Sequence, residues 1–372
     1  MTPGKSRTSG HPLGAAERER TADWLEAQQQ SDGSFDWCLG GKYDPWDHLH
    51  CAMGLMQMGR FDPALAAFDF LVRTQYPDGA WIAERRDGRI TNSGHESNHA
   101  AYLATGLWYY YRARQDVDLL AEMWPVLERA IEFVVRLQDE TGAISWIVND
   151  GKVWKAPLLT GSSSVHGSLT CAIRVAELLG HDRPRWRRCR ERLGRLLRQD
   201  LERFWKVDLP EGPGKMSMDW YYPVLGGAVR GEAGRARLLD PVLTDAFLTE
   251  GKGVRCVIAR PWYTAAETSE FILALDAAGL SARAREVFSW LEPFRTERDA
   301  YWTGLGYPEK LPYPENEETT YTAATILMAS DALADDSPTS SFFRDLAGED
   351  LDADQPDDVR DEPRVAENIS DA

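Results

Sequence analysis

Polar and aromatic residues recur at six places along the chain, each at the expected start of an apolar helix. The six stretches cover residues 44–48, 95–99, 160–164, 219–222, 263–267 and 317–321. Acids and hydroxyls at such positions are common helix N-caps. Capping does not explain the aromatic residues found with them, such as Trp46, Tyr221 and Tyr263. We therefore expect the six helix starts to meet at the mouth of one ligand-binding cavity.

Carboxylates in these stretches could supply the acid and the base of glycoside hydrolysis, which needs two carboxyl groups beside the bound sugar. The candidate catalytic residues are Glu96, Asp219, Glu267, Glu317 and Glu318, and Glu270 is a further carboxylate on the segment of Glu267. The residues that we expect to bind substrate are Trp46, Asp47, His48, Asn98, His99, Trp154, Tyr221, Tyr222, Arg260, Trp262, Tyr263 and Tyr321. The competing interpretation of any single glutamate is a helix cap or a salt bridge.

Metal-binding motifs occur, but their context argues against them. His95-Glu96-Ser97-Asn98-His99 matches His-Glu-x-x-His, which places two imidazoles on one helix face for zinc. Here a Ser-Gly pair precedes the motif and places it at a helix start, which favours contact with substrate. Residues 357–361 match Asp-Asp-x-x-Asp within an acidic segment where composition alone produces such strings. We assign no metal ligand and no certain cofactor, and leave a divalent metal open.

Helical periodicity dominates the chain, and strand-like alternation never lasts. We expect helices at 15–30, 45–58, 61–76, 96–114, 116–138, 163–179, 184–205, 218–229, 232–249, 264–279, 281–294 and 318–334. The first, third, fifth and seventh are amphipathic and charged, whereas the even ones are rich in small and aromatic residues. A helix that is apolar on all sides must be buried on all sides. The alternation predicts an all-α (α/α)6 toroid, with an inner and an outer ring.

The loops that follow the first, third and fifth helices repeat in sequence. Their shared elements are Gln28 with Asp32-Gly33 and Trp37, Gln75 with Asp78-Gly79 and Trp81, and Gln138 with Gly142 and Trp146. A weaker copy ends at Trp302. These elements resemble the repeats of the prenyltransferase and squalene-oxidase/cyclase superfamily over about residues 15 to 334. The resemblance implies an α/α toroid whose aromatic-lined cavity handles an isoprenoid or lipid-linked substrate.

The catalytic motifs of that superfamily are not matched. The chain has no Asp-x-Asp-Asp acid, and Asp47, His48, His50 and Cys51 do not have the spacing of the zinc set of protein prenyltransferases. The last helical segment also resembles that of glucoamylase-type six-hairpin glycosidases, which implies a general base near Glu317 or Glu318. Their general acid follows a tryptophan, whereas here Lys155 follows Trp154.

Three functions therefore remain open. We place a prenyltransferase- or cyclase-like enzyme first, because its repeat is the strongest resemblance. The alternatives are a six-hairpin carbohydrate-active enzyme with paired carboxylates and a non-catalytic binding scaffold. The expected partner is thus a small isoprenoid or sugar molecule.

Charge and composition limit the other partners. The net charge is −17, and residues 335–372 carry 13 acids and three arginines, which leaves −7 on the rest of the chain. A nucleic acid would need a basic face. No apolar stretch is long enough for a membrane span, and without a signal-like segment or paired cysteines we expect a cytoplasmic protein. We expect a flexible start over 1–14, one toroid domain over 15–334 and a disordered acidic tail over 335–372.

Overall fold

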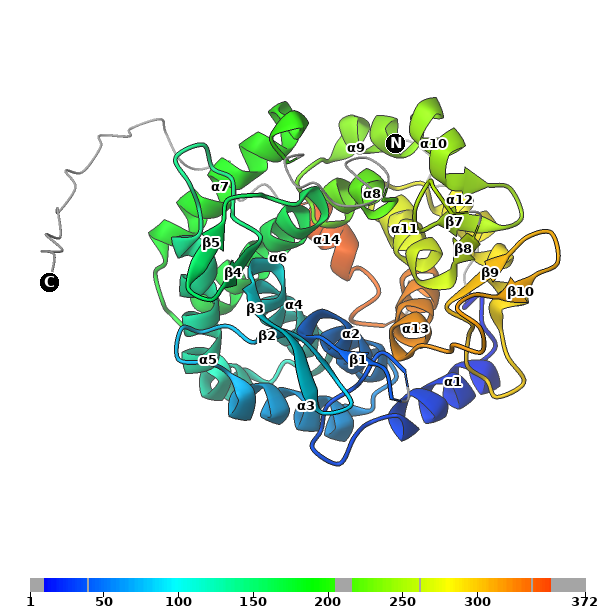
Figure 1. Cartoon of the computed structure of the whole chain (residues 1–372), viewed down its shortest axis with the longest axis horizontal. Coiled ribbons are helices and arrows are strands. Elements are labelled where there is room, and N and C mark those ends of the chain that lie inside the picture. Colours follow the sequence, from blue (N-terminus) through cyan, green and yellow to red (C-terminus); the bar gives the residue numbers. More distant parts are fainter. Residues whose placement is uncertain (1–9, 39, 205–215, 261, 336, 349–372) are drawn as a thin grey trace, which may run out of the picture.

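The computed structural model describes residues 10–38, 40–204, 216–260, 262–335 and 337–348. Its core is a closed ring of six inner helices, in which each helix contacts the next and the last contacts the first (Figure 1). The inner helices are α2 (Pro45–Gln57), α4 (Ser97–Arg114), α6 (Leu159–Leu178), α8 (Met218–Leu225), α11 (Ala265–Ala277) and α13 (Thr320–Ala334). The predicted inner ring is therefore present.

The outer helices surround this ring. They are α1 (Ala15–Ala27), α3 (Phe61–Thr74), α5 (Val117–Arg136), α7 (Pro184–Gln199), α9 (Gly231–Leu238) and α12 (Ser281–Phe288). The segment predicted over 232–249 is divided, because Asp240 caps a new helix, α10 (Pro241–Phe247), that has proline at its first position. The segment predicted over 281–294 ends as a 3₁₀ turn, Ser289–Phe294.

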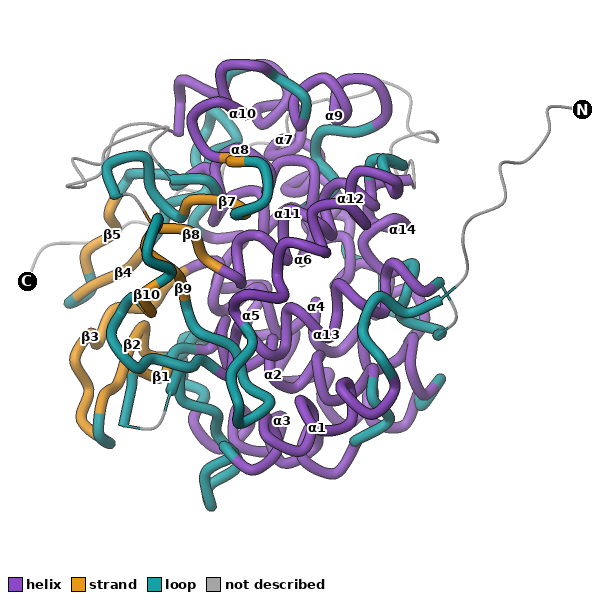
Figure 2. Tube along the Cα trace, turned by 90° about the vertical axis from the view of Figure 1, so that its right-hand side faces the viewer, coloured by secondary structure: helices purple, strands orange, loops and turns teal. Residues whose placement is uncertain are grey.

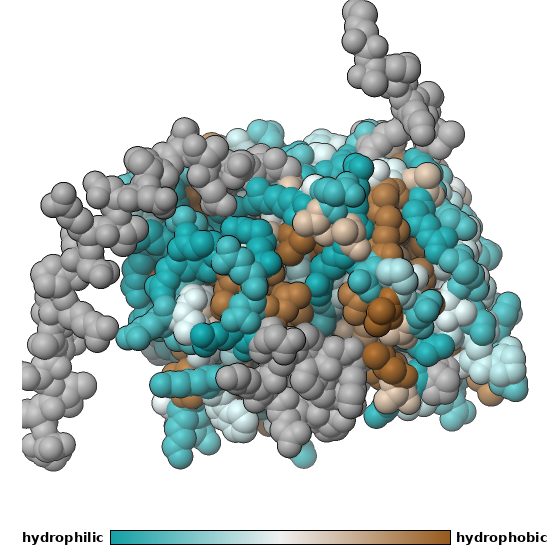
Figure 3. Space-filling view, turned by 90° about the horizontal axis from the view of Figure 1, so that it is seen from above, coloured by the Kyte–Doolittle hydropathy of each residue, from teal (hydrophilic) through white to brown (hydrophobic). Residues whose placement is uncertain are grey.

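Viewed from above, the surface is mostly hydrophilic, interrupted by hydrophobic patches (Figure 3).

Burial explains why small residues mark the inner helices. Every residue of α13 is buried, whereas α7 buries one stripe, which includes Arg190, and leaves its other arginines partly or fully exposed. A Cβ atom on Gly54 of α2 would lie 2.8 Å from the Cα atom of Ala324 on α13. Glycine and alanine thus allow these two helices to approach closely, and a larger residue at position 54 would push them apart.

The repeated loops fasten consecutive outer helices to one another. The side-chain amides of Gln29, Gln75 and Gln138 each donate to two backbone carbonyls, one four residues on and one in the next outer helix. The glycine of each loop has positive φ, and at Gly79 a Cβ atom would lie 2.1 Å from the carbonyl oxygen of Arg129. In the first copy the residue is Gln29, not the predicted Gln28, whose amide donates to Trp24 within α1.

The all-α prediction was wrong in one respect, because two five-stranded antiparallel sheets lie at one end of the ring (Figure 2). The first, in spatial order, comprises β1 (Lys42–Tyr43), β2 (Ile82–Arg86), β3 (Arg89–Glu96), β4 (Ile147–Asn149) and β5 (Lys152–Trp154). The second comprises β10 (Leu311–Pro312), β9 (Gly304–Gly306), β8 (Trp262–Thr264), β7 (Gly253–Arg255) and β6 (Leu248–Thr249). Strands β1, β3 and β8 lead into α2, α4 and α11, so the sheets position the starts of inner helices.

The predicted disordered tail begins with an ordered segment. Residues 342–348 form α14 (Phe342–Gly348), which contacts α8 and α11 and buries Phe342 and Leu346 in the core. The rest of that tail, including the Asp-Asp-x-x-Asp string at 357–361, lies outside the described residues, as do residues 1–9. Among the described residues, no helix has both the length and the apolar character needed to span a membrane.

Candidate active site

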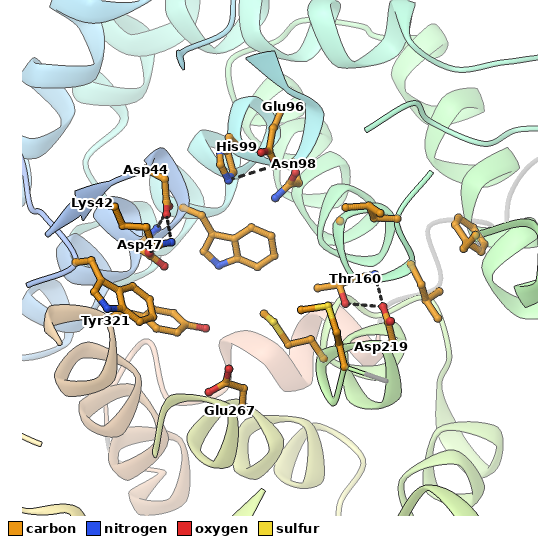
Figure 4. A pocket seen from close by; sticks show the side chains of 18 residues that line it. Lys42, Asp44, Asp47, Glu96, Asn98, His99, Thr160, Asp219, Glu267 and Tyr321 are labelled. Carbon is orange, nitrogen blue, oxygen red and sulfur yellow. Dashed lines mark hydrogen bonds and ion pairs between the residues drawn. The ribbon is translucent and has the colours of Figure 1, made fainter. Parts of the chain in front are cut away.

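A cavity of about 310 Å³ opens where the inner helices begin. Eight of the residues predicted from the sequence line it, and side chains from α2, α4, α8, α11 and α13 point toward its centre (Figure 4). They are Trp46, Asp47, Glu96, Asn98, His99, Asp219, Glu267 and Tyr321. The convergence of helix starts that the sequence analysis predicted is therefore present.

One wall of the cavity carries two carboxyl groups and a lysine. The Lys42 Nζ atom lies 2.7 Å from Asp44 Oδ2 and 3.1 Å from Asp47 Oδ2. Asp44 is also the N-cap of α2, where its Oδ1 accepts from the Asp47 N–H at 2.8 Å. Both carboxyl groups are buried, so the one lysine charge balances only one of them.

The environment divides the protons between these two carboxyl groups. Burial alone would raise the pKa of Asp44, but the nearby Lys42 charge and the bond from the Asp47 N–H outweigh it, and the pKa of Asp44 lies below its ordinary value. Burial and the negative charge of Asp44 raise the pKa of Asp47 well above its ordinary value. Asp44 is therefore the ionised partner of Lys42, and of the two carboxyl groups Asp47 is the one that retains a proton more readily.

Glu267 lies across the cavity from this pair. It projects from the first turn of α11 into the open space, and Figure 4 shows Asp47 on another wall. Among the residues that the structure describes, Glu267 has no hydrogen bond or ion pair, and its side chain is only half-buried. A carboxylate in this setting is free to accept a proton from a water molecule or a substrate hydroxyl.

Several buried polar atoms in the cavity lack partners. Trp46 Nε1, Asn98 Oδ1 and His99 Nδ1 form no hydrogen bond with any described residue. An unsatisfied buried polar atom costs about 1 to 3 kcal/mol. A sugar hydroxyl can both donate and accept, so a carbohydrate suits this mixture of one donor, one acceptor and an imidazole.

Glu96 and Asp219 also line the cavity, but protein groups already engage them. Glu96 Oε2 accepts from the Trp146 Nε1–H at 2.7 Å and lies 3.6 Å from His99 Nε2. Asp219 Oδ1 accepts from the backbone N–H and the hydroxyl of Thr160 at 3.1 and 2.8 Å. Asp219 thus joins the starts of α6 and α8, and Glu96 joins the start of α4 to the loop of Trp146.

The other two glutamates predicted to be catalytic lie outside the cavity lining. Glu317 Oε1 accepts from the Trp37 Nε1–H at 3.1 Å and from the Thr303 hydroxyl at 2.9 Å. Glu318 is buried and forms an ion pair with Arg298. The Arg298 contact supports the salt-bridge interpretation for Glu318, whereas Glu317 is held by hydrogen bonds from Trp37 and Thr303.

Most of the residues predicted to bind substrate also lie outside the cavity lining. His48 is fully buried: its Nδ1 accepts from the Phe35 N–H at 3.1 Å, and its Nε2–H donates to the Ala67 carbonyl at 3.0 Å. Tyr221 and Tyr222 lie below the cavity and donate to Glu270. The remaining four belong to the sheets or their loops: Trp154, Arg260, Trp262 and Tyr263. Because strands precede the helix starts here, these four side chains are carried away from the cavity.

The His-Glu-x-x-His motif does not form a zinc site. His95 lies near the end of β3, where its Nδ1 atom forms a hydrogen bond with Asp78 Oδ2 at 2.7 Å. His99 lies in α4 and lines the cavity. The two imidazoles therefore do not share a helix face. Within the described ranges, no three histidine, cysteine or acidic side chains come close enough to hold a metal ion.

Sequence reasoning missed part of the lining. Lys42 lies in a two-residue strand, and no signal in the sequence marks it. Asp44 belongs to the first of the six predicted stretches, where acids are expected as N-caps, and it is the N-cap of α2. Its spacing of three residues from Asp47 could also have indicated a pair of neighbouring carboxyl groups. An apolar wall was also missed: Leu158, Leu159, Phe204, Met216 and Met218.

Comparisons with known proteins identify the family. No family model matches the chain. It is 41% identical over 325 residues to the MMP endo-(1,4)-3-O-methyl-alpha-D-mannosidase of Mycolicibacterium hassiacum, a match that covers 87% of this chain and 88% of that protein. The prediction of a prenyltransferase- or cyclase-like enzyme is therefore wrong, and the glycosidase alternative is supported.

Solved structures show the same fold at low identity. A wild-type glycosidase aligns with a TM-score of 0.62 at 12% identity, covering 90% of this chain and 99% of that one. An alpha-amylase from Clostridium perfringens aligns with a TM-score of 0.60 at 10% identity, covering 85% and 96%. D-mannose isomerase aligns with a TM-score of 0.61 at 12% identity, covering 85% and 95%. The toroid thus matches glycosidase folds, and the 41% identity shows that this chain is a glycosidase-like enzyme belonging to the family of the MMP endo-(1,4)-3-O-methyl-alpha-D-mannosidase.

Proposed function

We propose that this enzyme hydrolyses α-1,4 bonds within a chain of 3-O-methylated mannose, with Asp47 as general acid and Glu267 as general base. The observation that carries the proposal is that the buried Asp47, beside the charged Asp44, shares one cavity with Glu267, which has no described partner; the raised pKa of Asp47 supports its role as proton donor. The relative's name supplies the bond, the sugar and the internal cleavage. The catalytic assignment rests on the cavity alone.

In the proposed reaction Asp47 is the proton donor and Glu267 is the proton acceptor. Asp47 donates its proton to the glycosidic oxygen as the bond from that oxygen to C1 breaks. A water oxygen forms the new bond to C1, and Glu267 accepts the proton that this water loses. The ionised Asp44, held by Lys42, favours the proton on Asp47 before the step and lies near the positive charge that develops on the sugar. Exchange with solvent then returns both carboxyl groups to their starting states.

This arrangement favours inversion at C1. Asp47 and Glu267 project from α2 and α11 on different sides of an open cavity (Figure 4), which leaves space for water beside Glu267. An inverting enzyme needs such space, whereas a retaining one places its nucleophile against the sugar. The first product should therefore be the β-anomer, detectable by proton NMR during hydrolysis. An initial α-anomer would assign Glu267 as a nucleophile.

The apolar wall supports a methylated substrate. Leu158, Leu159 and Phe204, together with Met216 and Met218, offer no strong donor or acceptor. A hydroxyl buried against them would lose hydrogen bonds to water at a cost of about 1 to 3 kcal/mol. A methyl ether has no donor to satisfy and gains from burying its methyl group.

The direct test uses two matched substrates. The purified enzyme is incubated with α-1,4-linked 3-O-methylmannose oligosaccharides and with the unmethylated oligosaccharides of equal length, and products are followed by mass spectrometry. Internal cleavage of the methylated set, with slower cleavage of the other, supports the proposal. Equal rates would remove the methyl specificity, and no cleavage of either set would remove the mannosidase function.

A further inference from the structure

A second carboxyl group, Glu270, lies beneath the cavity at the centre of the ring. It follows Glu267 by one turn of α11, and only 1% of its surface is exposed. Its oxygens accept hydrogen bonds from the hydroxyls of Tyr221 at 2.7 Å, Tyr222 at 2.5 Å and Tyr321 at 2.5 Å. The three hydroxyl donors stabilise the charged form of this carboxyl group, against the burial that disfavours it. No lysine or arginine pairs with it in the described part of the chain.

A histidine extends this group of residues without neutralising it. His50 Nδ1 lies 3.0 Å from the Trp46 carbonyl, which can only accept, so Nδ1 carries the hydrogen. Burial lowers the pKa of His50 to about 4, so the ring is neutral. Its Nε2 then accepts from the Tyr102 hydroxyl at 2.9 Å and cannot donate to Glu270, 3.8 Å away. The five helices α2, α4, α8, α11 and α13 thus meet around Glu270.

The tyrosines bound by Glu270 support the floor of the cavity. Tyr321 lines the cavity and stacks on Trp37 with ring centres 5.6 Å apart. Trp46, which also lines the cavity, packs its ring edge-on to Tyr222 at 5.4 Å and parallel to Tyr102 at 5.2 Å. A shift of Tyr321 or Tyr222 would therefore move an aromatic ring in the floor of the cavity, on which we expect the sugar to rest.

We propose that Glu270 is a positioning residue: by holding three tyrosine hydroxyls it fixes the aromatic floor that orients the sugar between Asp47 and Glu267. This inference rests on the proposed function, because the floor matters only if a sugar is cleaved above it. Glu270 itself does not line the cavity and touches no reacting atom. A displacement of about 1 Å at a reacting centre can lower a rate by about 100-fold, so a buried support can control catalysis without contact.

The test combines two substitutions that act through the same contact. Glu270→Gln keeps the size but loses an acceptor, and Tyr222→Phe removes one donor. Each should lower kcat on the methylated oligosaccharide by about 10- to 100-fold, with KM changed less than about threefold. The double variant should be no slower than Glu270→Gln alone, because the two residues act as a unit.

Asp331→Asn is the matched control. Asp331 is also 1% exposed on an inner helix, and it accepts from Ser337 Oγ at 2.7 Å and Thr339 Oγ1 at 2.9 Å. It does not line the cavity. This variant should lower Tm while kcat and KM stay within about twofold of the wild type. An equal loss of kcat in the control, or additive losses in the double variant, would overturn the positioning role.

A measurement independent of activity separates this inference from the proposed function. The near-ultraviolet circular dichroism of the aromatic floor should change in Glu270→Gln and Tyr222→Phe, and stay unchanged in Asp331→Asn. A wild-type enzyme without glycosidase activity would count against the proposed function alone. An unchanged spectrum in both floor variants would overturn the positioning role whatever the activity.

Discussion

Asp47 and Glu270 are both buried carboxyl groups near the centre of the ring, yet their surroundings differ. Asp47 shares a single lysine with another carboxylate, and burial with that negative charge raises its pKa. Burial also raises the pKa of Glu270, to about 7, but three tyrosine hydroxyls stabilise its charge. Asp47 is therefore suited to donate a proton beside the cavity, whereas Glu270 is suited to hold the tyrosine side chains around it. The contacts of a buried acid, more than its burial, thus indicate its role.

The largest expected effect on kcat comes from the two carboxyl groups that we propose to be catalytic. Asp47→Asn removes the proton donor, and Glu267→Gln removes the proton acceptor across the cavity. Each should lower kcat by about 10²- to 10⁴-fold, the usual contribution of a general acid or base. Steady-state rates on the methylated oligosaccharide measure the effect. Glu122→Gln, on the exposed face of α5, is the control. Retention of a tenth of the activity in either cavity variant would remove that residue from the chemistry.

Removing the lysine should test whether Asp44 needs a cation. Lys42→Met leaves the buried Asp44 charge without its 2.7 Å partner. An unpaired buried charge costs several kcal/mol, so we expect a loss of about 3 kcal/mol in the free energy of unfolding by urea. Lys152→Met, at an exposed position in β5, should change little. Asp44→Asn added to Lys42→Met should restore part of the loss, and its failure to do so would contradict the pairing.

The raised pKa of Glu270 predicts a pH effect of known sign. Because the pKa rises from 4.5 to about 7 on folding, the folded chain holds a proton that the unfolded chain has lost in this interval. The wild type should therefore lose stability between about pH 4.5 and 7 relative to Glu270→Gln, by roughly 3 kcal/mol in total. Urea unfolding at several pH values measures the difference. Parallel pH curves would show that Glu270 does not titrate in this range.

The smallest expected effect concerns the apolar wall. Met218→Asn places an amide where we expect a methyl ether to rest. The ratio of kcat/KM for methylated over unmethylated oligosaccharide should fall about tenfold, which corresponds to about 1.4 kcal/mol. Met218→Leu preserves the apolar surface and should preserve the ratio. A ratio that Met218→Asn leaves unchanged would place the methyl group elsewhere in the cavity.

The ring could be predicted from the sequence because its signals are local. Helical periodicity and the alternation of charged and small-residue helices appear within each segment, and Gly79 and Gly142 mark the repeated loops. The sheets could not be predicted, since strands such as β1 and β6 contain only two residues, and β1 pairs with a segment about 40 residues further along the chain. Short strands do not show the alternation on which such predictions depend.

The cavity was predictable only where it is built from helix starts. Glu267 and Asn98 lie in first turns of inner helices, and the structure brings both to the cavity. Trp154 and Trp262 lie on strands before the helices, and this offset of a few residues places them outside. Lys42 lies on a strand as well, yet the first sheet folds it beside Asp44. Pairing between distant loops, which the sequence does not display, decides these positions.

The short helix α14 narrows one end of the ring. It lies at the end of the ring remote from the sheets (Figure 2), where Phe343 and Leu346 border a space of only about 20 Å³ beside Glu270. In the described part of the chain the cavity is thus closed at this end. Under the proposed function, a glycan cut at an internal bond would lie across the rim with both ends outside, and the two sheets at the rim are the surfaces against which those ends would extend.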